Sequence, residues 1–137
     1  MSWQSEVLIP GEARGSVLRF SAPISFWGGV CPQTARVVMS GHPQFGKVVS
    51  DKILVIPELA GSSSSSAIIL ELIYKDLAPK ALVLGESDAI LPVGVIAARQ
   101  MGWLSLPVVV LPNAPFRFGD RLHLATSGVI QLTDCEG

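Results

Sequence analysis

Three aliphatic runs, separated by segments with helical spacing, constrain the fold of this chain more than any other feature of its sequence. The runs occupy residues 52–57, 81–84 and 107–111 and consist mainly of valine, leucine and isoleucine. Continuous apolar runs of this length, without polar alternation, are typical of strands that are buried on both faces of a parallel sheet. The three runs therefore predict central strands of an α/β domain.

Two segments between these runs carry the period of a helix. In residues 67–77 the apolar side chains recur every three or four positions, and Pro79 ends the segment. Residues 90–101 form the second segment, with Pro92 near its start, where a missing N–H costs little, and Gly102 after its last turn. Further β segments are expected at residues 14–20, 24–27 and 35–39, with a final hairpin at 121–124 and 128–132. The whole pattern predicts a compact α/β domain with a mixed sheet and at least two helices.

The shortage of charged side chains excludes several classes of protein. Charged residues make up 15% of the chain and hydrophobic residues 49%, whereas about 25% of an average soluble domain is charged and a disordered tail needs still more charge. The net charge is −1 and the cations are scattered, which argues against a nucleic-acid-binding face. No apolar run approaches the roughly 18 residues that cross a membrane. So few charges suggest that a partner protein covers part of the surface.

The first residues and the two cysteines indicate a cytoplasmic location. No basic segment followed by an apolar core is present at the start of the sequence, so no signal peptide is expected. Cys31 and Cys135 could form a disulfide, but because no leader is expected we predict that both thiols are reduced. Two cysteines are also too few to form a metal site of their own. Nothing near Cys31 in the sequence indicates a lowered thiol pKa. His42 and His123 have no metal-ligand spacing and are interpreted as structural.

The most distinctive polar segment is Gly61 followed by five serines, residues 62–66. A flexible linker here would leave two halves with marginal cores, so we expect a turn that opens a helix. One serine is expected to cap that helix. The others would surround the free N–H groups at the positive end of the helix dipole, where a carboxylate or phosphate binds. A serine hydroxyl in an activating environment is also a candidate base.

Two other segments, one aromatic and one acidic, are candidates for the binding site, and each also has a structural interpretation. Phe26 and Trp27 precede the flexible pair Gly28-Gly29, and they fit a core anchor as well as a pocket wall. A loop after the second aliphatic run carries Glu86 and Asp88, at the position where open α/β sheets place ligand groups, although a helix cap is favoured for Asp88. No GxGxxG, P-loop or GxSxG motif is present. Any demanding chemistry would therefore come from another component.

Three short motifs in a fixed order carry a family resemblance. They are ISFWGGV at residues 24–30, ILVIP at 53–57 with Gly61, Ser62 and Ser66 after it, and LAPKA at 77–81. With them the chain resembles, over nearly its whole length, the small swivel-domain subunit of the aconitase X family. The resemblance implies one swivelling β/β/α domain over residues 1–137. It also implies assembly with a large subunit that carries an iron or iron–sulfur centre, with no metal in this chain and no activity of the isolated chain.

The resemblance further implies a dehydratase. Family members remove water from hydroxy acids. The serine-rich sequence of residues 61–66 is similar to that of the bacterial members. The expected reaction is conversion of cis-3-hydroxy-L-proline to Δ1-pyrroline-2-carboxylate. Dehydration of mevalonate-5-phosphate, as in archaeal members, is the alternative, and a stand-alone anion-binding or scaffold module is an alternative of another class.

A loop of the aconitases themselves allows roles to be transferred to single residues. In that Gly-Ser-Ser-Arg loop the first serine acts as base, and Ser62 matches it. The expected substrate-binding residues are Gly61, Ser63, Ser64, Ser66, Phe26, Gly28 and Gly29. Ser64 stands where the loop has arginine, so carboxylate binding must come from helix N–H groups, other serines or the large subunit. Ser62 is expected to take the proton next to the carboxylate while the partner's metal polarises the leaving hydroxyl.

Overall fold

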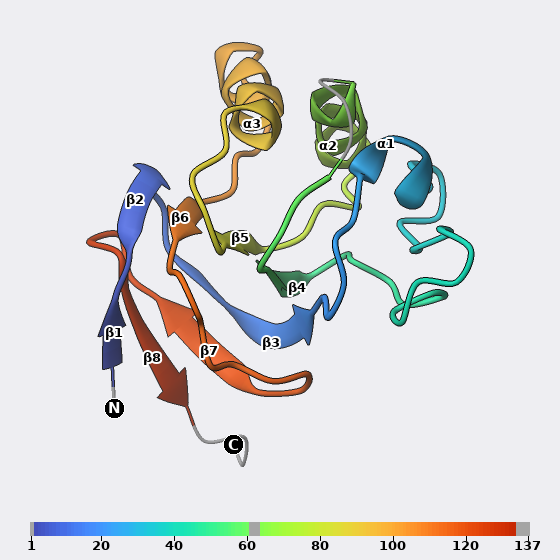
Figure 1. Ribbon diagram of the computed structural model, residues 1–137. Coiled ribbons are helices and arrows are strands. Elements are labelled where there is room, and N and C mark those ends of the chain that lie inside the picture. Colours follow the sequence, from blue (N-terminus) through green and yellow to red (C-terminus); the bar gives the residue numbers. More distant parts are fainter. Residues whose placement is uncertain (1, 61–63, 134–137) are drawn as a thin grey trace.

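The computed structural model describes residues 2–60 and 64–133, which fold into one mixed sheet with helices on one side (Figure 1). The strands are β1 Ser2–Gln4, β2 Glu6–Ile9, β3 Ala13–Arg19, β4 Lys52–Ile56, β5 Ala81–Leu84, β6 Val108–Val110, β7 Arg121–Leu124 and β8 Val129–Thr133. The helices are α1 Phe26–Gly29, α2 Ser65–Tyr74 and α3 Ile90–Gln100. In this part of the chain the sheet has eight strands in the order β1-β8-β7-β3-β4-β5-β6-β2.

The aliphatic runs form the centre of the sheet, as predicted. Strands β3, β4, β5 and β6 pair in parallel, and every residue of β5 and β6 is buried. Alternation along β4 sends Leu54 and Ile56 into the core beneath α2 and α3, and Ile53 and Val55 into a second core on the other face. The predicted hairpin is confirmed as β7 and β8, which pair antiparallel. The expected α/β class with a mixed sheet is confirmed.

The sheet curls so strongly that its two outermost strands are consecutive in the chain. Strands β1 and β2 lie at opposite ends of the strand order, yet only Ser5 separates them. Both the N–H and the Oγ of Ser5 donate to the carbonyl of Gly128, at 3.0 and 2.6 Å. Figure 1 shows β1, β7 and β8 on the side of the sheet away from α2 and α3. The second core fills this curl and includes Val17, Val55, Val83, Val109, Phe116, Leu122 and Ile130.

Two expected β segments are not strands, and backbone conformation explains both. Residues 24–27 contribute one bridge, Ile24 with Leu59, and then turn into the irregular α1 because Gly28 adopts φ +81°. Residues 35–39 contribute only isolated bridges, because Ala35 has φ 60° and the chain cannot stay extended through it. None of the helices in the described part of the chain is long and apolar enough to cross a membrane.

The two long helices approach each other closely at one glycine. Gly94 of α3 is buried, and a Cβ there would collide with the carbonyl oxygen of Ser66 and with the side chain of Ile69, both in α2. Helices α2 and α3 lie side by side over β4 and β5 (Figure 1). Gly94 therefore fixes the position of α3 against the first turn of α2.

Candidate functional site

The serine segment follows the carboxyl end of a central parallel strand. Strand β4 ends at Ile56, and α2 begins at Ser65. Carboxyl ends of parallel strands are where α/β sheets present ligand-binding groups. Gly61, Ser62 and Ser63 lie outside the described residues. Of the remaining serines Ser64 is exposed and Ser66 partly exposed. The side chain of Ser64, at the N-cap of α2, makes no capping hydrogen bond to the helix.

Ser65 is the serine that holds this region together. It is 4% exposed, and its Oγ accepts a hydrogen bond from the backbone N–H of Trp27 at 3.1 Å. The hydroxyls of Ser65 and Ser25 lie 3.4 Å apart. These contacts attach the irregular α1 turn to the first turn of α2. The sequence analysis assigns no role to Ser65, although its spacing from Ile68, Ile69 and Leu72 places it on the buried stripe of the helix.

The two aromatic rings before the glycine pair have opposite environments. Phe26 is 0% exposed and belongs to the helix-side core, whereas Trp27 is 56% exposed. Gly28 has nothing within 4 Å of the position a Cβ would take. The carbonyl of the buried Gly29 accepts from the N–H of Val38 at 2.8 Å. Trp27 is thus the ring presented to solvent beside the expected site.

Val38 and Met39 extend this apolar area. They are 44% and 39% exposed, and Met39 packs beside Gly29. We call Trp27, Val38 and Met39 the Trp27 surface. Exposed large apolar side chains grouped in this way are typical of a protein-contact area.

Asp88 caps α3, as the sequence analysis favoured. Its Oδ2 accepts from the N–H groups of Ile90 and Leu91, both at 3.0 Å. Asp88 and Ser65 line a common cavity of about 10 Å³, which has room for about one water molecule. That space is too small for a hydroxy acid, so a substrate at the start of α2 would need walls from elsewhere.

Both histidines have structural partners. The Nδ1 of His42 accepts from the N–H of Gln44 at 3.0 Å, and its Nε2 lies 3.2 Å from the carbonyl oxygen of Ala22. His123 pairs with Glu12, with Nε2 and Oε2 2.7 Å apart. This hydrogen bond and the charge of His123 lower the pKa of the Glu12 carboxyl.

The expectation of an ordinary Cys31 thiol is wrong. Its pKa is lowered, chiefly by the hydrogen bond with the Thr34 side chain and then by the backbone N–H groups of Gln33 and Thr34. These donors lie two and three residues further along a turn, and nothing in the composition of the segment indicates their orientation. Among residues 2–60 and 64–133, no three His, Cys, Asp or Glu side chains are grouped to hold a metal ion.

Comparison with known sequences gives one consistent family. The profile of the aconitase X swivel domain matches residues 2–132. Cis-3-hydroxy-L-proline dehydratases of Hypocrea jecorina and Pseudomonas aeruginosa are 39% and 40% identical over 83% and 76% of this chain. The chain spans only 19% and 18% of the length of those two proteins. The phosphomevalonate dehydratase small subunit of Methanococcoides burtonii is 36% identical over 90% of both chains.

Solved structures agree with the sequence comparisons. Aconitase X of Thermococcus kodakaraensis, in its holo form, superposes with a TM-score of 0.88 at 28% identity and covers 98% of this chain and 99% of its own. A UPF0107 protein solved by solution NMR has a TM-score of 0.83 at 26% identity, over 98% of this chain and all of its own. The expected swivel-domain fold is confirmed.

Proposed function

This chain belongs to the aconitase X swivel domain family, and from that premise we propose that it is the small subunit of a hydro-lyase that dehydrates a hydroxy acid. We propose further that residues 1–137 form a single domain of this type. The observation that carries the proposal is the similarity to a dehydratase small subunit over 90% of each chain. The two larger relatives are dehydratases as well, each carrying a matching segment within a much longer chain.

A large subunit would complete the site at the start of α2. The cavity between Ser65 and Asp88 is too small for a substrate, so a second polypeptide must supply most of the walls. The Trp27 surface lies beside the same turn and offers apolar side chains for that contact. In this proposal the serine segment closes the partner's active site, and the isolated chain has no activity.

The serines and the neighbouring glycines would bind and deprotonate the substrate. Ser62 would act as base on the carbon next to the carboxylate, supported by the positive end of α2. Gly61, Ser63, Ser64, Ser66 and the exposed backbone of Gly28 would contact the substrate, whereas the buried Gly29 would support the turn. Phe26 is buried, so it would act by fixing the turn that carries the two glycines. The hydrogen bond between Trp27 and Ser65 supports this arrangement because it holds both turns on one surface.

The iron or iron–sulfur centre of the family would be held by the large subunit. The described residues of this chain do not group three metal-ligating side chains, so they do not fit such a centre. When bound in the partner, a metal of this kind supplies a Lewis acid for the departing hydroxyl. The contribution of this chain is the base and the anion-binding N–H groups.

The favoured substrate is cis-3-hydroxy-L-proline, with Δ1-pyrroline-2-carboxylate as product. The support is the 39% and 40% identity to two dehydratases of this substrate. Dehydration of mevalonate-5-phosphate is the second candidate, favoured by the shared length with a phosphomevalonate dehydratase small subunit.

Co-expression with the large aconitase X-type subunit of the same organism tests the proposal. The purified pair would be assayed for water loss from cis-3-hydroxy-L-proline and from mevalonate-5-phosphate, with each subunit alone as control. Turnover of one substrate only by the pair supports the proposal and identifies that substrate. Failure of the two chains to associate would instead favour a stand-alone anion-binding or scaffold module.

A further inference from the structure

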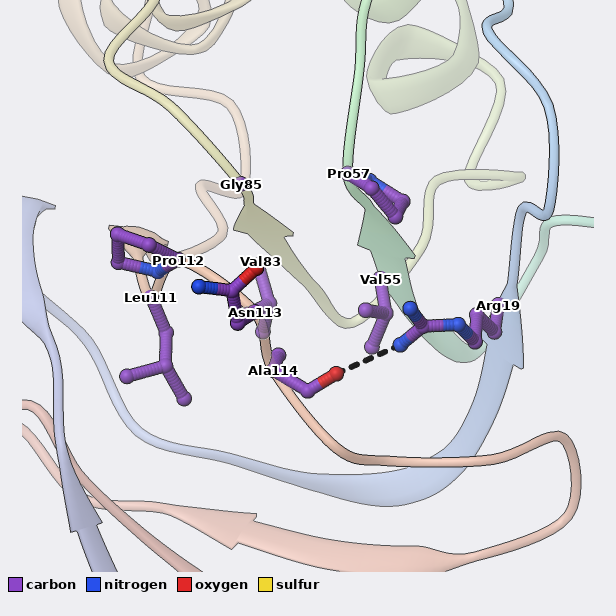
Figure 2. A pocket seen from close by; sticks show the side chains of 9 residues that line it. All are labelled: Arg19, Val55, Pro57, Val83, Gly85, Leu111, Pro112, Asn113 and Ala114. Carbon is purple, nitrogen blue, oxygen red and sulfur yellow. Dashed lines mark hydrogen bonds between the residues drawn. The ribbon is translucent and has the colours of Figure 1, made fainter.

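A cavity opens at the mouth of the curled sheet, on the side away from α2 and α3. It holds about 140 Å³ and lies at the carboxyl ends of β3, β4, β5 and β6 (Figure 2). Its lining residues are Arg19, Val55, Pro57, Val83, Gly85, Leu111, Pro112, Asn113 and Ala114. Val55 and Val83 belong to the core inside the curl, so the floor of the cavity is apolar. The cavity therefore lies on the face of the sheet opposite α2 and α3.

A partly buried arginine lines this cavity. Arg19 is the last residue of β3, and its Nη1 donates to the carbonyl oxygens of Ala114 at 2.7 Å and Phe116 at 3.2 Å. Both hydrogen bonds use the same nitrogen, whereas a guanidinium has five N–H donors on three nitrogens. Among the described residues no carboxylate forms an ion pair with Arg19. Glu58 lines a neighbouring hollow together with Arg19, so the side chain brings to the cavity a positive charge without a salt bridge, and further donors.

A second polar side chain lies across the cavity. Figure 2 shows the Asn113 amide on the side opposite the Arg19 guanidinium, with Val83 near the amide. Asn113 adopts φ 57°, a left-handed conformation that asparagine tolerates better than most residues. Its amide can donate two hydrogen bonds. In Figure 2 the amide oxygen lies nearer the guanidinium than the amide nitrogen does, so rotation of the amide is needed to turn its NH2 group toward the same small space as the cation.

We propose that this cavity binds a small oxyanion, a carboxylate or phosphate group. Arg19 would hold two of its oxygens and Asn113 would donate to another. The volume of about 140 Å³ has room for one such group, since about 10–15 Å³ on the same measure holds one water molecule. Barrel mouths and the carboxyl edges of parallel strands are common places for ligands, and the apolar floor of valines strengthens charged hydrogen bonds there. The inference does not depend on the proposed dehydratase function.

A purely structural role for Arg19 is the competing explanation, because its two hydrogen bonds hold residues 114–116 in place. The test must therefore measure binding. The full-length chain, labelled with nitrogen-15, would be titrated with sodium phosphate and separately with sodium acetate, followed by amide chemical shifts. The pH is fixed and ionic strength is held low with sodium chloride, since salt screens such contacts. We expect saturable shifts at Gly85, Asn113 and Ala114 with a dissociation constant in the millimolar range.

Three variants separate binding from folding. Arg19→Gln removes the charge, and Asn113→Asp keeps the size and the left-handed tolerance while placing a negative charge in the cavity. Each should weaken anion binding about 10- to 100-fold, the usual effect of losing a charged hydrogen bond. Arg99→Gln removes the same charge from an exposed position on α3 and should leave binding unchanged.

The outcomes are distinct. Saturation by phosphate alone, or by both anions, supports the site and identifies the group it accepts. If neither anion causes saturable shifts, or if the shifts persist unchanged in Asn113→Asp, the proposal is overturned. Asn113→Asp keeps the test valid even if Arg19→Gln disturbs the fold, because it leaves both hydrogen bonds of Arg19 in place.

Discussion

The backbone N–H of Trp27 donates to the hydroxyl of Ser65 across 3.1 Å, and this bond joins two turns that are far apart in the sequence. One turn carries an exposed indole, and the other opens α2. Because Ser65 is buried although Trp27 is exposed, the bond is partly shielded from water. The relative position of the two turns therefore depends on one serine out of five.

Replacing Ser65 by alanine should destabilise the chain. The change leaves the Trp27 N–H without its acceptor, which costs about 1–3 kcal/mol for a buried group. Ser105→Ala, at an exposed position, is the matched control and should change the free energy of unfolding by no more than about 0.5 kcal/mol. Urea unfolding followed by circular dichroism measures both. Equal midpoints for the two variants would contradict the role of Ser65.

Replacing Trp27 by alanine should weaken association with the large subunit. Alanine keeps the backbone N–H that binds Ser65 and removes only the exposed ring, so the fold should persist. Central aromatic residues of interfaces commonly contribute enough that the dissociation constant rises at least about tenfold. Leu104→Ala is the control: Leu104 is 75% exposed and lines a hollow with Asp51 and Lys80 at the opposite edge of the sheet. Calorimetric titration of the large subunit with each variant gives the comparison; the same affinity for both would place the contact elsewhere.

Replacing Ser62 by alanine should abolish most turnover in the assembled enzyme. General base catalysis contributes about 10²- to 10⁴-fold, so kcat should fall by at least the lower figure. Affinity for the large subunit and the circular dichroism spectrum should stay unchanged. Near-normal turnover of Ser62→Ala would remove this residue from the mechanism while leaving the subunit assignment intact.

Replacing Gly94 by alanine should destabilise the chain although alanine favours helices. By helix propensity alone the change would stabilise by about 1 kcal/mol. Here the added methyl group collides with the Ser66 carbonyl and with Ile69, and such overpacking costs about 1–3 kcal/mol. Val93→Ala, on the exposed face of the same helix, is the control. A thermal midpoint at or above that of the parent chain would show that α3 moves away from α2 without cost.

The Cys31 thiol should react faster with iodoacetamide near neutral pH than an unperturbed cysteine. Its pKa is lowered by the hydrogen bond with Thr34 and by neighbouring backbone N–H groups, so more thiolate is present below the usual value of about 8.5. The rate of Cys31 alkylation, followed by peptide mass analysis from pH 6 to 10, should have its midpoint below that of an unperturbed cysteine thiol measured in the same way. Thr34→Val should move the midpoint upward, and an unchanged midpoint would rule out the Thr34 contact as the cause.

The central fold could be predicted because its signals are local. Each aliphatic run has apolar side chains on both faces, so its own composition predicts that it is buried on both faces. Asp88 precedes α3 and accepts hydrogen bonds from the first N–H groups of that helix, as a capping residue does. Strands β1 and β2 gave no such signal, since they are only three and four residues long and partly exposed. Their pairing with β8 and β6 depends on contacts more than 90 residues away in the chain, which a local pattern does not contain.

The candidate site was harder to predict than the fold. The composition of residues 61–66 indicated a polar turn before a helix. The five serines have the same side chain, so only the position of Ser65 relative to the buried face of the helix distinguishes it from the others. Phe26 and Trp27 were equivalent in sequence, and only the irregular α1 turn decides that Phe26 is buried and Trp27 exposed. Arg19 carried no signal, because its importance comes from carbonyl oxygens about 95 residues further along.

The position of Ser5 has a consequence for how the chain folds as it leaves the ribosome. The segments on either side of Ser5 form the two edge strands of the sheet, yet their pairing partners, Val108–Val110 and Val129–Thr133, are synthesised much later than they are. Residues 2–9 therefore stay unpaired until those two strands have been made, and such non-local pairing slows folding. Deleting residues 2–9 would expose the outer edges of β8 and β6 at once, so aggregation of the newly made chain is the expected result.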